Sequence, residues 1–383
     1  MTTPLPRNEF AATEKYVYLN HAAVGILPHS SRIAIEQLLR EHGEAGVLGT
    51  FPYDARMPEY RDRIARFIGA RGSEIATVPS TSSGANVVAL GIDWRPGDEV
   101  LLCDNEFPSN AVPWVALRKR GVGVRLLTTR EERLTPERLK RELRPQTRAV
   151  ALSWVSYADG YRHDLTSLSQ VAHAGGALLC VDAIQGLGAL RLDVREAGVD
   201  TLYAGAGKWM LGLHGIGLLY VREDLIDRLT LAMPGWRSMH DMWDFHEYEQ
   251  PYAAQAMRFE GGTPNIVGTL SLVRSIDLFE RCDPAAIERH VLTLTDYLCE
   301  RLTGAGATVL TQRGAGISSG IVTFEIAGVD SVALGRAMQK EGVVTTYRPG
   351  GIRVAPHGYN TLEDVDRLVE FARDATRLAP RMS

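Results

Sequence analysis

The chain has 383 residues, of which 45% are hydrophobic and 23% charged, and its formal net charge is −4. This composition is ordinary for a globular protein, and the slightly acidic balance argues against a nucleic-acid partner, which needs a basic surface. No apolar run approaches the roughly 20 residues that cross a bilayer, and the polar N-terminus lacks the apolar segment of a secretory signal. The four cysteines form no CxxC pair or Cys/His cluster, so we expect a cytoplasmic protein without a metal site.

The middle of the chain alternates short apolar runs with amphipathic stretches, which is typical of a mostly parallel α/β sheet. Several runs are almost entirely apolar, as expected for strands that helices cover on both faces. The stretch 165–174 is predicted as a helix, with Asp164 as its N-cap and two glycines as its stop signal. Seven strands are predicted here, at residues 75–78, 99–103, 124–127, 149–154, 177–181, 201–203 and 216–221.

After residue 265 the pattern changes to long helical stretches followed by short strands and further helices. We interpret this part as a smaller α+β domain that the N-terminal segment joins. The predicted division is a large domain at 46–264 and a small domain at 1–45 with 265–383. The elements predicted in the small domain are helices at 266–280, 287–302, 331–341 and 362–378 and strands at 307–311, 317–325, 343–346 and 352–354.

Two of the predicted strands lead into residues that could bind a ligand or take part in catalysis. Ligands of open α/β sheets bind outside the carboxyl ends of the strands. Strand 177–181 runs into Asp182, whose carboxylate is costly to bury without a cation or a strong donor; otherwise it caps the next helix. Strand 201–203 is followed by the small residues AGAG and then Lys208. These residues leave room for a flat ligand, although a lysine there can also simply be solvated.

The segment 155–221 resembles the class V aminotransferase family of pyridoxal-phosphate (PLP) enzymes. The matching motifs are VSYADGYRHDL, VDAIQ and DTLYAGAGKWMLGLHGIGLLYV, in the family's order and spacing. The resemblance extends from about residue 18 to residue 373. It implies PLP as cofactor and the fold type I architecture: a mostly parallel seven-stranded sheet with helices on both faces, plus a smaller α+β domain.

The resemblance assigns catalytic roles to Lys208 and Asp182. Lys208 would hold the cofactor aldehyde as a Schiff base, and Asp182 would pair with the protonated pyridine nitrogen and keep the ring an electron sink. Gln185 would donate to the ring hydroxyl oxygen. Phe107, in the run EFPSNAVPW, would stack on the ring; its alternative is a core aromatic.

Two segments are candidates for the cofactor phosphate. In STSSGAN, residues Thr81, Ser82 and Gly84 can offer hydroxyls and backbone N–H groups at a helix N-terminus, although read alone this is only a good capping sequence. In EGGTPN, the resemblance implies that Thr263 reaches the phosphate of a partner subunit, and hence a homodimer with shared active sites.

One departure from the family lies just before the lysine. Many relatives place Ser and His there as phosphate donors, whereas this chain has Gly205 and Gly207. Phosphate binding is therefore expected to depend more heavily on Thr81, Ser82 and Thr263.

The amino-acid substrate is expected to meet Arg353, in the run GGIRVAPHGYNT. The family's arginine there forms a bidentate pair with the substrate α-carboxylate; the alternative is a surface arginine on a strand. His21 is either a polar contact or a satisfied turn residue. Trp236 and Arg237 are predicted in a loop near the mouth, where Arg237 would contact a distal anionic group. Three residues are placed beside substrate or cofactor by resemblance: Asn20, His21 and Tyr157.

The segment before Arg353 indicates the type of reaction, because it lacks a cysteine. Cysteine desulfurases of the family carry a cysteine there, whereas residues 343–352 read VVTTYRPGGI. The sequence therefore predicts an amino-acid aminotransferase, with a C–S or β-eliminating lyase or an epimerase as alternatives, and disfavours a persulfide-forming desulfurase. A dinucleotide oxidoreductase is poorly supported because no GxGxxG run follows an early strand.

Overall fold

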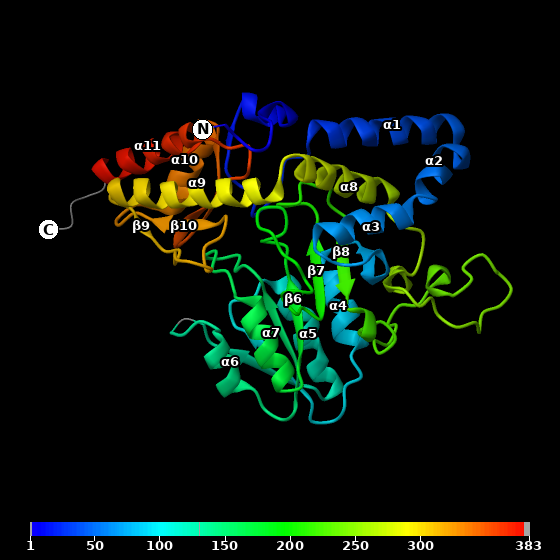
Figure 1. Cartoon of the computed structure of the whole chain (residues 1–383). Coiled ribbons are helices and arrows are strands. Elements are labelled where there is room, and N and C mark those ends of the chain that lie inside the picture. The colour runs from blue at the N-terminus through cyan, green and yellow to red at the C-terminus, as the bar shows by residue number, and fades with distance from the viewer. Residues whose placement is uncertain (1, 130, 379–383) are drawn as a thin grey trace.

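A seven-stranded sheet forms the centre of the computed structural model, which describes residues 2–129 and 131–378 (Figure 1). Its strand order is β2-β8-β7-β6-β5-β3-β4. β8 is antiparallel to both neighbours and the remaining pairs are parallel, so the predicted sheet is confirmed. The bounds are β2 (Ile75–Val78), β3 (Glu99–Cys103), β4 (Gly123–Leu127), β5 (Thr147–Ser153), β6 (Leu178–Asp182), β7 (Thr201–Gly205) and β8 (Gly217–Val221).

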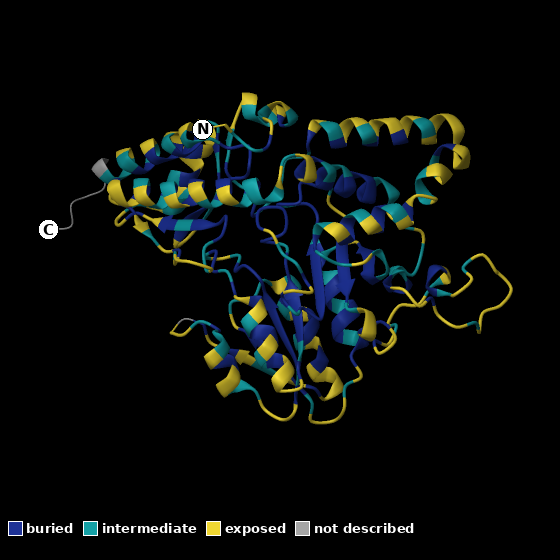
Figure 2. Cartoon of the chain, in the orientation of Figure 1, coloured by how far each residue is buried: buried dark blue, intermediate teal, exposed yellow. Residues whose placement is uncertain are grey.

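Helices cover both faces of this sheet, which explains why its strands are nearly all apolar. In β3, Val100 and Leu102 point into the core under α4 and α5, whereas Leu101 and Cys103 join the core under α3 and α7. Figure 2 shows the central strands buried throughout. The covering helices are α3 (Met57–Phe67), α4 (Thr81–Gly91), α5 (Pro108–Val115), α6 (Pro136–Glu142) and α7 (Leu165–Ala174). As predicted, the Asp164 side chain caps α7 by accepting from the Ser167 amide.

Three further helices lie above the sheet in the view of Figure 1. They are α1 (His29–Ala45), α2 (Val47–Asp54) and α8 (Ile266–Arg281). α8 packs against both α1 and α3. The helix that begins at the predicted domain boundary thus contacts the helices of the N-terminal third, and the boundary itself stays a prediction.

The C-terminal part is a separate α+β layer. A four-stranded sheet has the order β12-β13-β10-β9, and a two-stranded sheet joins β1 to β11 in parallel. The N-terminal strand therefore pairs with a strand of the C-terminal part. The elements are β1 (Val17–Tyr18), α9 (Pro284–Gly304), β9 (Thr308–Val309), β10 (Val322–Glu325), α10 (Ser331–Lys340), β11 (Val343–Val344), β12 (Thr346–Arg348), β13 (Gly351–Val354) and α11 (Leu362–Leu378).

Three of the four strands predicted in this layer are longer than those observed, whereas β13 begins one residue before its predicted start and most of β12 was not predicted. The run expected at 317–325 is a strand only in β10, because the chain before it turns so that Gly320 packs against the Trp209 ring. The remaining short elements are 3-10 helices at Arg7–Glu9, Ala11–Glu14, Gly72–Glu74, Ala116–Arg120, Glu223–Leu225, Trp236–Ser238 and Ala256–Glu260.

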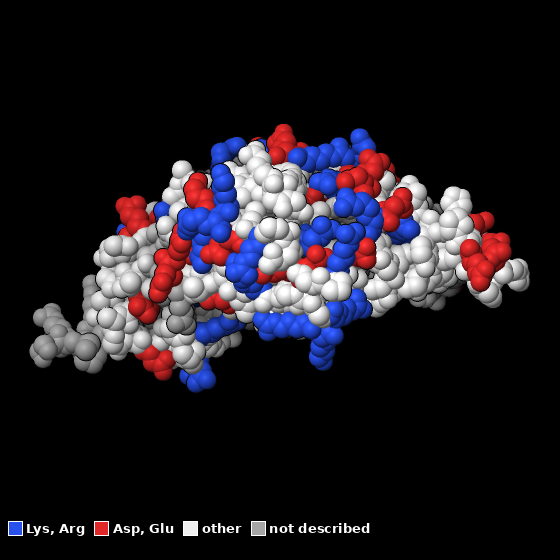
Figure 3. All heavy atoms as spheres, turned by 90° about the horizontal axis from the view of Figure 1, so that it is seen from below, with Lys and Arg blue, Asp and Glu red and all other residues white. Residues whose placement is uncertain are grey.

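Acidic and basic side chains are interspersed on the face seen from below (Figure 3). This matches the small net charge of −4. Among the described helices, none combines the length and the apolar character that a membrane span needs.

Candidate active site

The carboxyl ends of β6 and β7 bring Asp182 and Lys208 to one edge of the sheet. Asp182 is the last residue of β6 and lies opposite Tyr203 of β7, while Lys208 follows the end of β7. Because the two strands are parallel, their carboxyl ends open at the same edge. A cavity of about 230 Å³ lies there, and both side chains line it together with Thr81 and Phe107. Four residues predicted from separate motifs are thus brought together.

The Asp182 carboxylate is buried, and only one of its two oxygens accepts a hydrogen bond from the described residues. Its Oδ1 accepts a hydrogen bond from the Ile184 amide at 2.9 Å, whereas its buried Oδ2 has no hydrogen-bond partner among the described residues. Burial raises the pKa of Asp182 to about 7, and the neighbouring Glu106 adds to the rise. A buried carboxylate oxygen without a donor is costly. A protonated ring nitrogen would supply that donor, so Asp182 fits the pyridine nitrogen of PLP.

Lys208 is set up as an amine that can lose its proton. Burial lowers the pKa of Lys208 to about 8, against the opposing influence of the Asp182 carboxylate, and the charges of Arg353 and Arg348 lower it further. A lowered pKa increases the fraction of neutral, nucleophilic amine near neutral pH. The lysine Nζ lies 5.4 Å from the centroid of the Phe107 ring. Phe107 therefore faces the cavity of Lys208, as a ring-stacking residue must.

The N-terminus of α4 forms the other end of this cavity. Ser80 caps the helix by accepting from the Ser83 amide, and the Gly205 amide donates to Thr81 Oγ1 at 2.9 Å. The hydroxyl hydrogen of Thr81 thus remains available to an anion, which the positive end of the helix dipole also attracts. Ser80 and Thr81 line the cavity, whereas Ser82 does not.

Gly84 has a packing role in this helix. A Cβ on Gly84 would lie 2.5 Å from Tyr203 Cβ, so only glycine lets α4 approach β7 this closely. Its predicted contact with the cofactor phosphate stays a prediction.

His214 is a cavity residue that the sequence reasoning missed. It lines the cavity and is exposed, and it makes no hydrogen bond or ion pair with any described residue. Its Nδ1 lies 2.8 Å from the place where a Cβ on Gly207 would stand. The signal was the glycine at 207 in place of the family's histidine, but only the folded loop shows that another imidazole occupies the space. Ser109 also lines the cavity and was missed.

Arg353 lies on the buried strand β13, not on an open surface. Its Nη1 donates to the Tyr157 carbonyl at 2.8 Å, and its buried Nε has no partner among the described residues. Burial lowers the pKa of Arg353 to about 10, and the charge of Arg348 lowers it further. Arg353, Arg348 and Tyr157 line a second cavity of about 170 Å³. The Tyr157 ring also meets the Phe107 ring edge to face at 5.1 Å, so the two cavities have lining residues in contact with each other.

Gln185 and His21 have their polar atoms occupied by protein groups. Gln185 accepts from Trp209 Nε1 at 2.9 Å and donates to the Ala22 carbonyl at 3.0 Å. His21 bonds the Ala355 carbonyl through Nδ1 at 2.8 Å and the Tyr359 hydroxyl through Nε2 at 2.7 Å. Neither lines the two cavities. For His21 this geometry fits the satisfied turn residue, and for both the predicted ligand contacts stay predictions.

Asn20 and Arg237 also find protein partners. Asn20 Oδ1 accepts from Thr346 Oγ1 at 2.7 Å. Arg237 is buried and forms an ion pair with Asp54 at 2.7 Å, so the chain itself supplies the anion that Arg237 was expected to find in a substrate. Trp236 lines another cavity, with Trp243 next to it at a ring distance of 5.7 Å.

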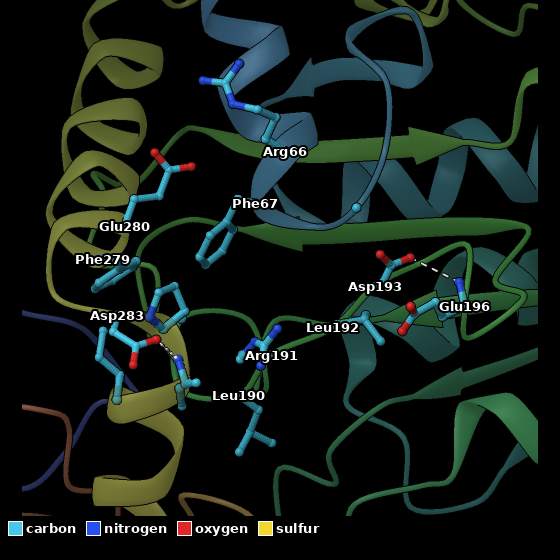
Figure 4. Close-up of a pocket in the computed structure, with 16 residues that line it drawn as sticks. Arg66, Phe67, Leu190, Arg191, Leu192, Asp193, Glu196, Phe279, Glu280 and Asp283 are labelled. Carbon is cyan, nitrogen blue, oxygen red and sulfur yellow. Dashed lines mark hydrogen bonds between the residues drawn. The ribbon is translucent and has the colours of Figure 1, made fainter.

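A further cavity of about 530 Å³ lies away from these residues (Figure 4). Phe67 and Phe279 are part of its lining, and charges of both signs surround them, including Arg66 and Glu280. None of the predicted site residues lines it. No group of described side chains has the composition of a metal site.

Comparison with known proteins shows to which family the chain belongs. The model of the family described as "Aminotransferase class-V" matches residues 17–368. The chain belongs to this family. Pyridoxal phosphate is its cofactor, in agreement with the orphaned Asp182 oxygen and the lysine beside it.

Several relatives of this class V enzyme carry desulfurase names. A "Probable cysteine desulfurase" of Methanothermobacter thermautotrophicus is 29% identical and covers 97% of both chains, and a "Cysteine desulfurase" of Enterobacter sp. is 30% identical over 92% of this chain and 91% of its own. An "Uncharacterized aminotransferase YcbU" of Bacillus subtilis is 30% identical over 81% of each chain. A solved cysteine desulfurase of Thermococcus onnurineus superimposes with a TM-score of 0.88 at 25% identity, over 97% of this chain and 98% of its own.

These comparisons correct the predicted reaction. The sequence favoured an aminotransferase and disfavoured a cysteine desulfurase, and this prediction was wrong. The exclusion rested on the missing cysteine in residues 343–352. That absence bears only on which group accepts the sulfur, because the groups that hold PLP and the amino acid are separate from it. A missing acceptor in one segment therefore does not exclude a desulfurase.

Proposed function

We propose that this class V enzyme removes sulfur from a cysteine-type amino acid, as a cysteine desulfurase does. The proposal rests on one observation: Lys208, the half-satisfied Asp182 and the buried Arg353 line two neighbouring cavities in a chain that matches named desulfurases over almost their full length. PLP, when bound, supplies an electron sink for charge that develops at the substrate Cα.

The chain's own residues support this chemistry in separate ways. Asp182 keeps the ring nitrogen protonated, because that proton satisfies the orphaned Oδ2. The Nζ of Lys208 takes and returns the proton at the substrate Cα, for which a pKa of about 8 is well placed. Arg353 binds the α-carboxylate through its guanidinium. Phe107 covers the ring and excludes water from one face.

Thr81 and His214 are the residues that we assign to the cofactor phosphate. Thr81 has a free hydroxyl hydrogen at a helix N-terminus, and His214 has a free imidazole at the cavity edge. His214 thereby takes the place of the histidine that relatives carry where this chain has Gly207.

A homodimer is part of the proposal. Thr263 is exposed and does not line the cavity of its own chain, which is consistent with a hydroxyl that serves a partner's phosphate. Mass measurement by light scattering tests the dimer. Mixing Lys208→Ala with Thr263→Ala chains tests the sharing, because exchange creates a site with both native residues and restores tight cofactor binding there. Two independent sites would show no recovery.

The division into domains 46–264 and 1–45 with 265–383 is also proposed. Its support is that Arg353 of the C-terminal layer hydrogen-bonds the Tyr157 carbonyl beside the central sheet, so the amino acid would bind between the two parts. A cytoplasmic location is proposed on the four free cysteines, which a reducing compartment preserves.

The assay for sulfur removal uses L-cysteine and dithiothreitol. One dithiothreitol thiolate attacks the substrate sulfur as the Cβ–S bond breaks, and Cβ takes a proton. The second dithiothreitol thiol then closes the ring disulfide and releases sulfide. We expect equal amounts of alanine and sulfide from the PLP-loaded enzyme, none from Lys208→Ala, and native rates from the exposed Lys340→Ala control. Transfer of the amino group to a keto acid without sulfide would contradict the proposal.

A further inference from the structure

The cavity beside Arg353 holds a second arginine and no counter-charge. Arg348 ends β12 and Arg353 lies on β13, and the two antiparallel strands place Arg348 opposite Gly351. No acidic side chain is among the described residues that line this cavity: Tyr157, Ala158, Thr323, Thr346, Arg348, Pro349, Gly350, Gly351 and Arg353.

The two arginines differ in how the protein holds them. Arg353 is only 8% exposed and is held by the Tyr157 carbonyl, with its Nε unpaired. Arg348 is exposed and forms no hydrogen bond or ion pair with the part of the chain that the structure describes. Buried arginines elsewhere, such as Arg61 with Glu260, meet a carboxylate within the protein. Among the buried arginines, Arg353 is therefore unusual in having no carboxylate partner among the described residues.

The like charges act on each other and on the lysine. The charge of Arg348 lowers the pKa of Arg353 and also that of Lys208. Two cations beside one cavity are mutually unfavourable until anions arrive. One carboxylate pairs with one guanidinium in the bidentate geometry, so an amino acid with a single carboxylate leaves one arginine unpaired.

We infer that Arg348 binds a second anionic group, and that the substrate is a cysteine-type amino acid with an acidic group besides its α-carboxylate. The inference deepens the proposed function and rests on it for the cysteine part alone. Arg353 holds the α-carboxylate from the buried side of the cavity, and Arg348 meets the second group at the exposed side. Specificity follows because a neutral side chain there gains nothing from Arg348.

The test measures how the PLP-loaded protein binds glutarate, which has two carboxylates, and butyrate, which has one. Isothermal titration gives both affinities for the native chain and for variants. Arg348→Gln should lower the ratio of glutarate to butyrate affinity about tenfold, because one charge-assisted pair is lost. Arg348→Lys should keep most of the ratio, since a cation remains. Arg353→Gln should weaken both ligands.

Arg336→Gln is the charge-matched control, an exposed arginine on α10 outside the cavity; it should leave both affinities unchanged. An unchanged ratio of glutarate to butyrate affinity in Arg348→Gln would overturn the inference. If both affinities fall by the same factor, the two arginines bind the same carboxylate; if neither falls, Arg348 binds no anion. These ligands contain no sulfur, so the outcome is independent of whether the enzyme cleaves a C–S bond.

Discussion

Gly207 and His214 occupy complementary space: a Cβ on Gly207 would lie 2.8 Å from the Nδ1 of His214. The imidazole stands where a side chain at 207 would begin, at the edge of the cavity that Thr81 and Lys208 also line. We therefore propose that His214, from another part of the same loop, serves as the phosphate donor that position 207 lacks.

His214→Ala should weaken PLP binding. A hydrogen bond to a charged group contributes about 1.5–3 kcal/mol, which corresponds to a tenfold or greater rise in the dissociation constant. Titration of the apoprotein with PLP, followed by absorbance, measures the effect, and pyridoxal, which has no phosphate, is the control ligand.

The same pair permits a rescue. Gly207→His alone should also bind PLP poorly, because the new side chain displaces the exposed His214 imidazole and the two rings compete for one space. The double variant Gly207→His/His214→Gly should recover affinity. If pyridoxal and PLP lose affinity equally in His214→Ala, the imidazole has no part in holding the phosphate.

Asp182→Asn should change how apoprotein stability depends on pH. Burial raises the pKa of Asp182 to about 7 in the folded chain, from an unfolded value near 4. Between these values the folded state binds more protons than the unfolded state, so this group makes stability fall as pH rises from about 4 to about 7. Thermal unfolding of the native and Asp182→Asn apoproteins should give similar Tm values near pH 4 and a higher Tm for the variant near pH 8. If the Tm difference between the variant and the native apoprotein instead shrinks toward pH 8, the Asp182 carboxylate is not buried without a partner.

Gly84→Ala should destabilise the fold. The added Cβ would lie 2.5 Å from Tyr203 Cβ, and relief requires α4 to move away from β7. Overpacking of this kind costs about 1–3 kcal/mol of unfolding free energy, measured by chemical denaturation. Gly43 is the matched control, because it lies in helix α1 with nothing near its Cβ position. Gly43→Ala should stabilise the helix by up to about 1 kcal/mol.

Arg353→Gln should raise the KM for the amino acid far more than it alters PLP affinity. The lost pair with the α-carboxylate should cost about 2–5 kcal/mol, and Arg353 does not line the PLP cavity. Steady-state kinetics and cofactor titration on the same preparation separate the two effects. An unchanged KM would remove Arg353 from the substrate site.

The sequence predicted much of this site because local patterns carry it. Apolar runs followed by Asp182 and by Lys208 placed both residues at strand ends, and the motifs around them indicated the family and its cofactor. Phe107, Thr81, Tyr157 and Arg353 were also found by motif, and each lines one of the two cavities.

Other assignments needed knowledge of neighbours. Gln185 and His21 have the right residue types, but their hydrogen bonds go to Trp209 and Tyr359. Arg237 pairs with Asp54, which is far away in the chain. A motif identifies the side chain, but it does not show which protein group binds that side chain in the folded structure.

What the sequence determined by itself was the sheet, the family and the cofactor, because strand patterns and motif spacing are local properties of the chain; that Lys208 carries the cofactor stays a prediction. Tertiary structure alone decided that His214 fills the space next to Gly207 and that Arg348 and Arg353 line one cavity in which no described residue supplies a negative charge. Hydrogen bonds and Coulomb interactions act over a few ångströms in space, whatever the separation along the chain, so free and occupied polar groups are told apart only after folding.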